Sequence, residues 1–123
     1  MTARILYVDD EADIREIACL CLELDPDLEV RSCASGAEAL DVAREWRPAL
    51  ILLDVMMPGM DGPETFRRLQ AQDATGHVPV VFITARTQAK EVEAFKAMGA
   101  VGVIAKPFEP MTLAAAVRAF MPL

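Results

Sequence analysis

The chain has 123 residues, of which 54% are hydrophobic, and its formal net charge at pH 7 is −7. This length suits a single α/β domain with a sizeable hydrophobic core. The negative charge disfavours a nucleic-acid partner, because such binding depends on neutralising phosphates. No apolar run reaches the roughly 18 residues that a membrane span needs. The N-terminal residues lack the layout of a signal peptide, so we expect a cytoplasmic protein that does not enter a membrane.

Apolar patterns in the first half of the chain predict three strands and two helices. We expect the strands over residues 3–8, 28–33 and 50–53, and the helices over 12–25 and 36–46. The apolar positions that give the first helix its buried face are Ile14, Ile17, Ala18, Cys21 and Leu24. Ser35 and Glu38 fit a capping box that satisfies the first amides of the second helix. The continuous apolar run over residues 50–53 is typical of a strand buried on both faces.

The second half predicts three more helices and two more strands. A helix opens at Asp61–Glu64 with Pro63 in its first turn, and residues 71–78 are expected to be a loop. Strands are predicted over 80–83 and 101–105. Between them lies a helix that Thr87 is expected to cap and Gly99 to end. Pro110 is expected to start the last helix.

Five strands that alternate with five helices predict a doubly wound parallel sheet with helices on both faces. We expect the flavodoxin-like strand order 2-1-3-4-5 and a single domain over residues 1–123. In such sheets the chemistry gathers beyond the carboxyl ends of the strands. The residues that follow each strand are therefore the candidates for function.

Four of the five predicted strands deliver a compatible polar group to that edge. These groups are Asp9 and Asp10 after the first strand, Asp54 after the third, Thr84 after the fourth and Lys106 after the fifth. Three neighbouring carboxylates repel one another, and a hard divalent cation relieves that repulsion. Ligands that are all oxygen favour Mg²⁺ over Zn²⁺, with Mn²⁺ as an alternative. The sequence therefore predicts a magnesium site.

The remaining groups suit a phosphoryl group seated on Asp54. Lys106 would supply positive charge and Thr84 a hydrogen-bond donor, while Ala85 is small enough to leave room for the phosphate. Carboxylates act as phosphoryl acceptors in covalent mechanisms. Positioning and charge neutralisation are what phosphoryl transfer requires, and this set supplies both.

The chain resembles response-regulator receiver domains, and among them the single-domain chemotaxis-type regulators of two-component signalling. The matching segments are Val8-Asp9-Asp10-Glu11, Leu53–Gly62, Ile83-Thr84-Ala85 and Lys106-Pro107-Phe108. The resemblance implies that Asp54 accepts phosphate from a histidine kinase or a histidine phosphotransfer protein. It also implies that the backbone carbonyl of Met56 joins Asp9, Asp10 and Asp54 in holding Mg²⁺. Lys106 would contact the phosphate, and the peptide bond from Lys106 to Pro107 would be cis.

The same resemblance implies a switch. Thr84 would move toward the phosphate and shift the face built from the fourth helix, the fifth strand and the fifth helix. That face would bind a downstream protein that the sequence does not identify. The domain itself is expected to be a monomer or a weak dimer. The chain departs from the family pattern at Val103, where an aromatic residue is common and turns with the threonine. We hypothesise that Met56 and Arg86, which flank the site, shield the phosphate from water.

Three alternatives remain at this stage. A phosphorelay shuttle that passes phosphate on to a histidine phosphotransfer protein would use the same site. A small phosphatase with an aspartate nucleophile is less favoured, because such enzymes place a second acid where this chain has Met56. Nucleotide binding is disfavoured because no GxGxxG follows the first strand. We therefore expect a signalling protein that assists its own phosphorylation and slow dephosphorylation, and not a turnover enzyme.

Overall fold

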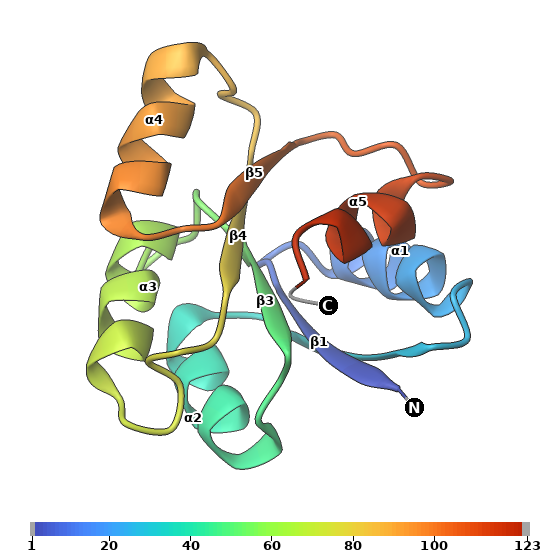
Figure 1. Ribbon diagram of the computed structural model, residues 1–123, viewed down its shortest axis with the longest axis horizontal. Coiled ribbons are helices and arrows are strands. Elements are labelled where there is room, and N and C mark those ends of the chain that lie inside the picture. Colours follow the sequence, from blue (N-terminus) through green and yellow to red (C-terminus); the bar gives the residue numbers. More distant parts are fainter. Residues whose placement is uncertain (1, 122–123) are drawn as a thin grey trace.

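The structure of the protein is a computed structural model that describes residues 2–121, so residues 1, 122 and 123 of the expected domain lie outside it. Strands and helices alternate along the chain (Figure 1). The strands are β1 (Ala3–Val8), β2 (Leu28–Cys33), β3 (Leu50–Asp54), β4 (Val80–Thr84) and β5 (Gly102–Ala105). The helices are α1 (Ala12–Glu23), α2 (Gly36–Trp46), α3 (Gly62–Ala71), α4 (Ala89–Met98) and α5 (Leu113–Ala119).

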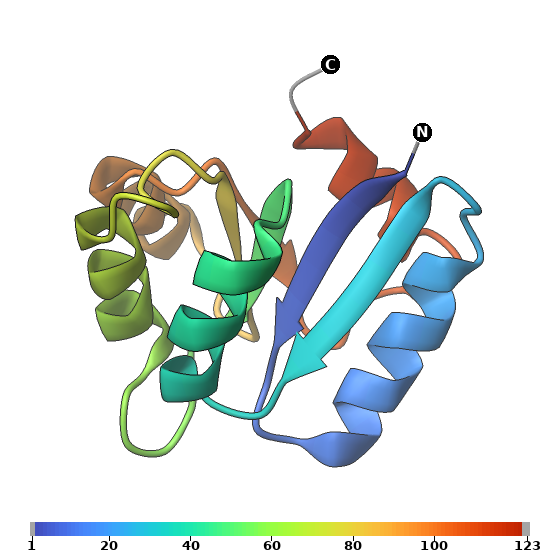
Figure 2. The same cartoon turned by 90° about the horizontal axis from the view of Figure 1, so that it is seen from below.

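The five strands form one sheet in the order β2-β1-β3-β4-β5, with parallel pairing throughout. Helices α1 and α5 cover one face of the sheet, and α2, α3 and α4 cover the other (Figures 1 and 2). Every residue of the central strand β3 is buried, as its continuous apolar run predicts. The predicted doubly wound fold and strand order are confirmed.

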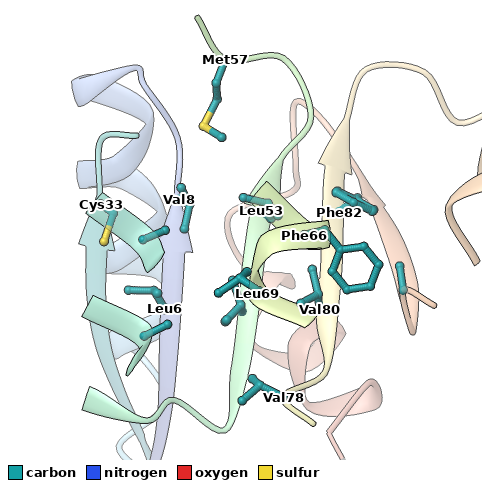
Figure 3. Packing of buried hydrophobic residues seen from close by; sticks show 14 of the residues in the cluster. Leu6, Val8, Cys33, Leu53, Met57, Phe66, Leu69, Val78, Val80 and Phe82 are labelled. Carbon is teal, nitrogen blue, oxygen red and sulfur yellow. The ribbon is translucent and has the colours of Figure 1, made fainter. Parts of the chain in front are cut away.

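Two hydrophobic clusters, one on each side of the sheet, hold the helices in place. Because successive strand residues point to opposite faces, neighbouring positions in one strand enter different clusters. Leu53 and Phe82 pack on the side of α2, α3 and α4 (Figure 3), whereas Leu52 and Ile83 pack beneath α1 and α5. Burying each such side chain stabilises the fold by about 1.5–3 kcal/mol.

Side-chain caps begin two of the helices where the sequence predicts them. Ser35 Oγ accepts a hydrogen bond from the Glu38 amide at 3.2 Å, and Asp61 Oδ1 accepts one from the Glu64 amide at 2.9 Å. The Glu38 carboxylate differs from the expected box, since it accepts from the Ala34 amide, which lies outside the helix. Because Asp61 caps α3, the helix begins directly after the loop that follows β3.

Three sequence expectations about helices are wrong. Ile17 and Leu24 are exposed, because the turn of α1 directs Ala18, Cys21 and Leu22 toward the sheet instead. The residue that precedes α4 is Gln88 and not Thr87, and it makes no side-chain cap. The last helix begins at Leu113, because residues 110–112 form a turn in which the Thr112 amide bonds to the Glu109 carbonyl at 3.2 Å.

Within residues 2–121, no helix combines the length and apolar character needed to cross a membrane.

Candidate functional site

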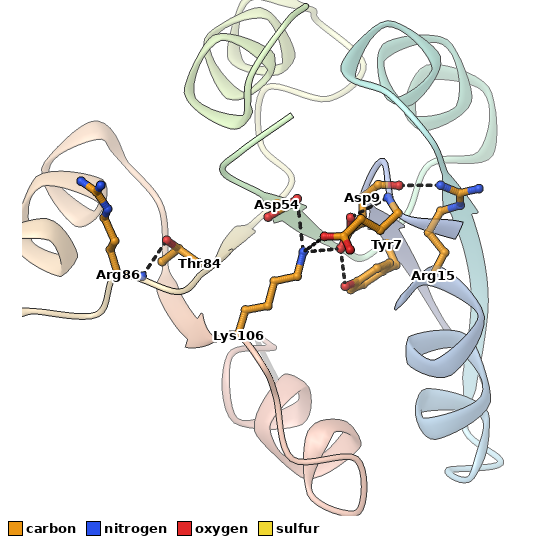
Figure 4. Close-up of polar contacts among 8 residues, drawn as sticks. Tyr7, Asp9, Arg15, Asp54, Thr84, Arg86 and Lys106 are labelled. Atoms are coloured by element: carbon orange, nitrogen blue, oxygen red, sulfur yellow. Dashed lines mark hydrogen bonds and ion pairs between the residues drawn. The ribbon is translucent and has the colours of Figure 1, made fainter. Parts of the chain in front are cut away.

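The carboxyl ends of four strands bring the predicted polar residues to one edge of the sheet (Figure 4). Asp9 follows β1, Asp54 is the last residue of β3, Thr84 ends β4 and Lys106 follows β5. Because parallel strands all end at the same edge, residues far apart in the chain meet here. Lys106 and Asp9 are 97 residues apart, and their side chains are in direct contact.

Three carboxylates lie together at this edge. Asp9, Asp10 and Asp54 each offer one oxygen, and these atoms all lie within 4.8 Å of one another. Asp9 and Asp54 are buried, whereas Asp10 is exposed, so the cluster opens to solvent on one side. A set of oxygen donors at this spacing fits a hard divalent cation such as Mg²⁺. The role expected for the Met56 backbone carbonyl stays a prediction.

Lys106 is the positive charge that faces the carboxylates. Its Nζ lies 3.0 Å from Asp9 Oδ2, 3.3 Å from Glu11 Oε1 and 3.5 Å from Asp54 Oδ2. Burial alone would lower the pKa of Lys106, but the hydrogen bond to Asp9 and the charges of Asp54 and Asp9 raise it to about 12. The ammonium is therefore charged at physiological pH. The peptide bond from Lys106 to Pro107 is cis.

Of the two buried carboxylates, Asp54 has fewer hydrogen-bond partners. The residue is 3% exposed, and the hydrogen bond it accepts from Lys106 is long at 3.5 Å. Burial first, and then the charge of Asp9, raise the pKa of Asp54 to about 6, although Lys106 opposes this rise. An ionised carboxylate that is buried with few partners is costly, so Asp54 is the group that gains most from a new cation or a covalent change.

Asp9, by contrast, is held by donors from several segments. Tyr7 Oη and Lys106 Nζ both donate to Asp9 Oδ2 at 3.0 Å, and the Glu11 amide donates to Asp9 Oδ1 at 2.9 Å. Arg15 Nη1 donates to the Asp9 carbonyl at 2.8 Å. Burial, and then the charge of Asp9, raise the pKa of Tyr7, so its hydroxyl keeps its proton. These contacts fix the orientation of Asp9.

Sequence reasoning missed the roles of Tyr7, Glu11 and Arg15. Tyr7 lies within a strand, where an aromatic residue is typical of a core position. Glu11 is the third member of an acidic run, and nothing local indicates that it contacts Lys106, 95 residues away. Arg15 lies on α1 at a spacing that predicts only a partly exposed helix position. No signal in the sequence alone identifies these contacts.

Thr84 lies at the far side of the site, and its side chain is buried. Its Oγ1 accepts a hydrogen bond from the Arg86 amide at 3.0 Å, and the Arg86 side chain points away from Asp54 (Figure 4). Val103, at the position where the family often has an aromatic residue, is partly buried. Above Asp54 a cavity of about 600 Å³ has walls that include Met56, Thr84, Ala85, Lys106, Pro107 and Phe108.

This geometry can neutralise an anionic group at Asp54 in two ways. Asp9 and Asp10 offer oxygens for a divalent cation, and the Lys106 ammonium contacts both Asp9, at 3.0 Å, and Asp54, at 3.5 Å. The cavity gives access to Asp54 from outside. The arrangement is suited to phosphoryl transfer, in which positioning and charge stabilisation supply most of the catalysis.

Similar proteins are response regulators. MtrA of Mycobacterium tuberculosis H37Rv, named as a DNA-binding response regulator, is 40% identical over 119 residues, which are 97% of this chain and 50% of MtrA. PhoB of Escherichia coli K12, named as a transcriptional regulatory protein of the phosphate regulon, is 37% identical over 121 residues, 98% of this chain and 52% of PhoB. The chain thus spans about half the length of the curated relatives that it matches.

Solved structures show the same similarity. The chemotaxis protein CheY4 of Vibrio cholerae superposes with a TM-score of 0.90 at 34% identity, covering 98% of this chain and 100% of CheY4. A putative response regulator from Chloroflexus aurantiacus superposes with a TM-score of 0.87 at 32% identity, covering 98% of both chains. The family model of the response regulator receiver domain matches residues 5–118. The chain therefore belongs to the response regulator receiver domain family.

Proposed function

We propose that residues 1–123 form one receiver domain that acts as a phosphorylation-controlled switch of two-component signalling, with Asp54 as the phosphoryl acceptor. The observation that carries this proposal is the grouping at the sheet edge. Three carboxylates have oxygens within 4.8 Å of one another, and the Lys106 ammonium lies 3.5 Å from Asp54. Asp54 is favoured over Asp9 as the acceptor because donors already occupy both oxygens of Asp9.

The phosphoryl donor would be a phosphohistidine of a histidine kinase or of a histidine phosphotransfer protein. An oxygen of ionised Asp54 attacks the phosphorus, the phosphorus–nitrogen bond breaks, and its electron pair returns to the imidazole, which takes up a proton. Mg²⁺ bound by Asp9, Asp10, Asp54 and the Met56 carbonyl would neutralise charge on the transferred group. The Lys106 ammonium, which contacts both Asp9 and Asp54, neutralises further charge, and Asp9 keeps its orientation through Tyr7 and the Glu11 amide.

The phosphoryl group would then act as a new hydrogen-bond acceptor. The Thr84 hydroxyl, which now accepts from the Arg86 amide, can turn to donate to it, and this favours one of two arrangements of the loop between β4 and α4. The face formed by α4, β5 and α5 would carry the change to a downstream protein. In this proposal the domain undergoes one modification per cycle and does not turn over a substrate.

The DNA-binding function in the printed name of MtrA is not proposed for these residues. The alignment covers about half of that protein, and on this chain it spans the residues that the receiver-domain model matches. The net charge of −7 on this chain opposes direct contact with phosphates of DNA. A protein partner is therefore the proposed target of the switch.

Incubation with acetyl phosphate and Mg²⁺, followed by intact mass spectrometry, tests the proposal. We expect the mass to increase by one phosphoryl group, mapped to Asp54, and we expect the increase to disappear when EDTA is present. Asp54→Asn should not gain the group, whereas Asp41→Asn, which removes an exposed carboxylate from α2, should gain it as the unchanged protein does. A folded wild-type protein that gains no phosphoryl group, or an Asp54→Asn variant that gains it equally, would overturn the proposal.

A further inference from the structure

The sheet next to the site has an aromatic contact in an unexpected place. Val103 of β5 pairs in register with Phe82 of β4, so β5 places no ring beside Phe82. The ring of Phe95 from α4 fills this role, with its centroid 4.7 Å from that of Phe82 and an angle of 42° between the planes. Phe66 of α3 contacts Phe82 from another side, at 5.5 Å and nearly perpendicular. The partner for Phe82 nearest the expected output face is therefore on α4.

Phe82 and Thr84 both belong to β4 and are two positions apart. Their side chains therefore lie on the same face of the sheet. Both are buried, and Phe82 is inaccessible to solvent. Because protein interiors are packed nearly as densely as crystals, a shift of the end of β4 at Thr84 cannot be absorbed by empty space around Phe82. It has to move a neighbouring side chain.

The helix α4 is fixed less firmly than its neighbour at its amino-terminal end. None of its residues is fully buried, and Gln88 provides no side-chain cap, whereas α3 is capped by Asp61. One carboxylate oxygen of Glu91, in its first turn, is buried and has no hydrogen-bond partner among residues 2–121. The other end is held, since Gln70 donates to the Met98 carbonyl at 3.3 Å. The contacts therefore hold the carboxyl-terminal end of α4 more firmly than its amino-terminal end.

We propose that Phe95 couples phosphorylation at Asp54 to a movement of α4, through its contact with Phe82. Thr84 turning toward the phosphoryl group shifts the end of β4, Phe82 shifts with it, and the ring of Phe95 transmits the shift to the loosely held helix. Phe95 thus replaces the ring that Val103 does not provide. This inference rests on the proposed function, because it takes phosphorylation of Asp54 as the event that moves Thr84.

Hydrogen exchange of the α4 amides tests the coupling, with and without Mg²⁺ and beryllofluoride, a stable mimic of a phosphoryl group. In the wild-type protein we expect addition of the mimic to change the exchange rates of α4 by about five-fold or more, the usual lower range of coupling between sites. Phe95→Leu keeps an apolar side chain but loses the ring, so the change should fall below about two-fold. Phe66→Leu is the matched control, since it removes a ring that touches the same Phe82 from α3, and it should keep the full change.

One further measurement separates failure of the coupling from failure of the proposed function. Mass spectrometry after acetyl phosphate treatment reports whether Asp54 is modified in each variant, and a wild-type protein without modification contradicts the proposed function itself. If Asp54 is modified and α4 responds equally in the wild type and in Phe95→Leu, only the coupling role is refuted. Equal loss of the response in both leucine variants would also refute it, because general packing would then be the cause. Phe95→Met serves as a second variant if Phe95→Leu does not fold.

Discussion

Replacing Asp54 by asparagine is expected to stabilise the fold at neutral pH when divalent cations are absent. The carboxylate is 3% exposed, and burial, followed by the charge of Asp9, raises its pKa from 3.8 to about 6 despite the opposing effect of Lys106. Asparagine has nearly the same shape and no charge to bury. Lys106 would not be left alone, because Asp9 and Glu11 remain at 3.0 and 3.3 Å from its Nζ.

The sign and size of the effect follow from proton linkage. A carboxyl whose pKa is raised in the folded state binds its proton more tightly in that state than in the unfolded chain. The protonated Asp54 therefore stabilises the fold fully below about pH 4, and this stabilisation is lost as the pH rises through about 6. A shift of roughly two pKa units corresponds to about 3 kcal/mol. Asparagine avoids this loss, so the variant should be more stable than the wild type by about 3 kcal/mol at pH 8 and by about half of that at pH 5.

Urea unfolding in EDTA at pH 5 and pH 8, followed by circular dichroism, measures both differences. Asp73→Asn is the matched control because it removes an exposed carboxylate that forms no ion pair within residues 2–121, and we expect its effect to stay within about 0.5 kcal/mol at both pH values. If Asp54→Asn is less stable than the wild type at pH 8, or if its gain is the same at both pH values, then burial of an ionised Asp54 does not weaken the fold and the reasoning is wrong.

Further results are expected from the same site. Mg²⁺ at a hundred times its dissociation constant should stabilise the wild type by about 2.7 kcal/mol and raise its melting temperature accordingly. The rise should be much smaller in Asp10→Asn and in Asp54→Asn, and equal rises in the wild type and both variants, measured by scanning calorimetry, would contradict the metal assignment. Lys106→Met should raise the pKa of Asp54 above about 6, because it removes the ammonium that lowers this pKa. Carboxyl NMR titration measures the pKa, and an unchanged or lower value in the variant would contradict the expectation. Met56→Asn should shorten the half-life of the phosphorylated protein, measured by loss of label, and unchanged decay would refute shielding by this side chain. Arg86→Ala should leave the half-life unchanged, because the Arg86 side chain points away from Asp54 (Figure 4), contrary to the shielding expected from the sequence.

The fold could be predicted because strongly apolar runs of four or five residues mark the buried strands. Residues 50–53 and 80–83 are both wholly buried in the structure. Helix boundaries were harder to predict, because competing turns decide them. Pro110 is a good first residue for a helix, yet the bond from the Thr112 amide to Glu109 delays the helix to Leu113. Ile17 and Leu24 fit a helical repeat and are still exposed, since a repeat does not reveal which of two overlapping faces packs on the sheet.

The positions of the candidate site residues could be predicted from strand ends alone, because the topology of a parallel sheet gathers those ends. The contacts that orient them could not. Tyr7 is hydrogen-bonded to Asp9 only because the chain leaves β1 with both side chains on the same side, and Glu11 reaches Lys106 only because β1 and β5 end at the same edge. Such contacts depend on side-chain directions in three dimensions. The sequence pattern therefore indicates which chemistry is present but not which of the two buried carboxylates has fewer hydrogen-bond partners.

The difference in hydrogen-bond partners between Asp9 and Asp54 determines how the domain could work. Donors hold Asp9 in a fixed position, whereas Asp54 is buried with one long hydrogen bond, and we expect its ionisation to weaken the fold. A divalent cation would relieve that cost at Asp54 and would also neutralise the negative charge that a phosphoryl group adds there. Anything that binds the folded state better than the unfolded state stabilises it, so a cation bound at this position should tighten the domain. Because α4 is the helix held least firmly near Thr84, we expect it to show this change in stability first.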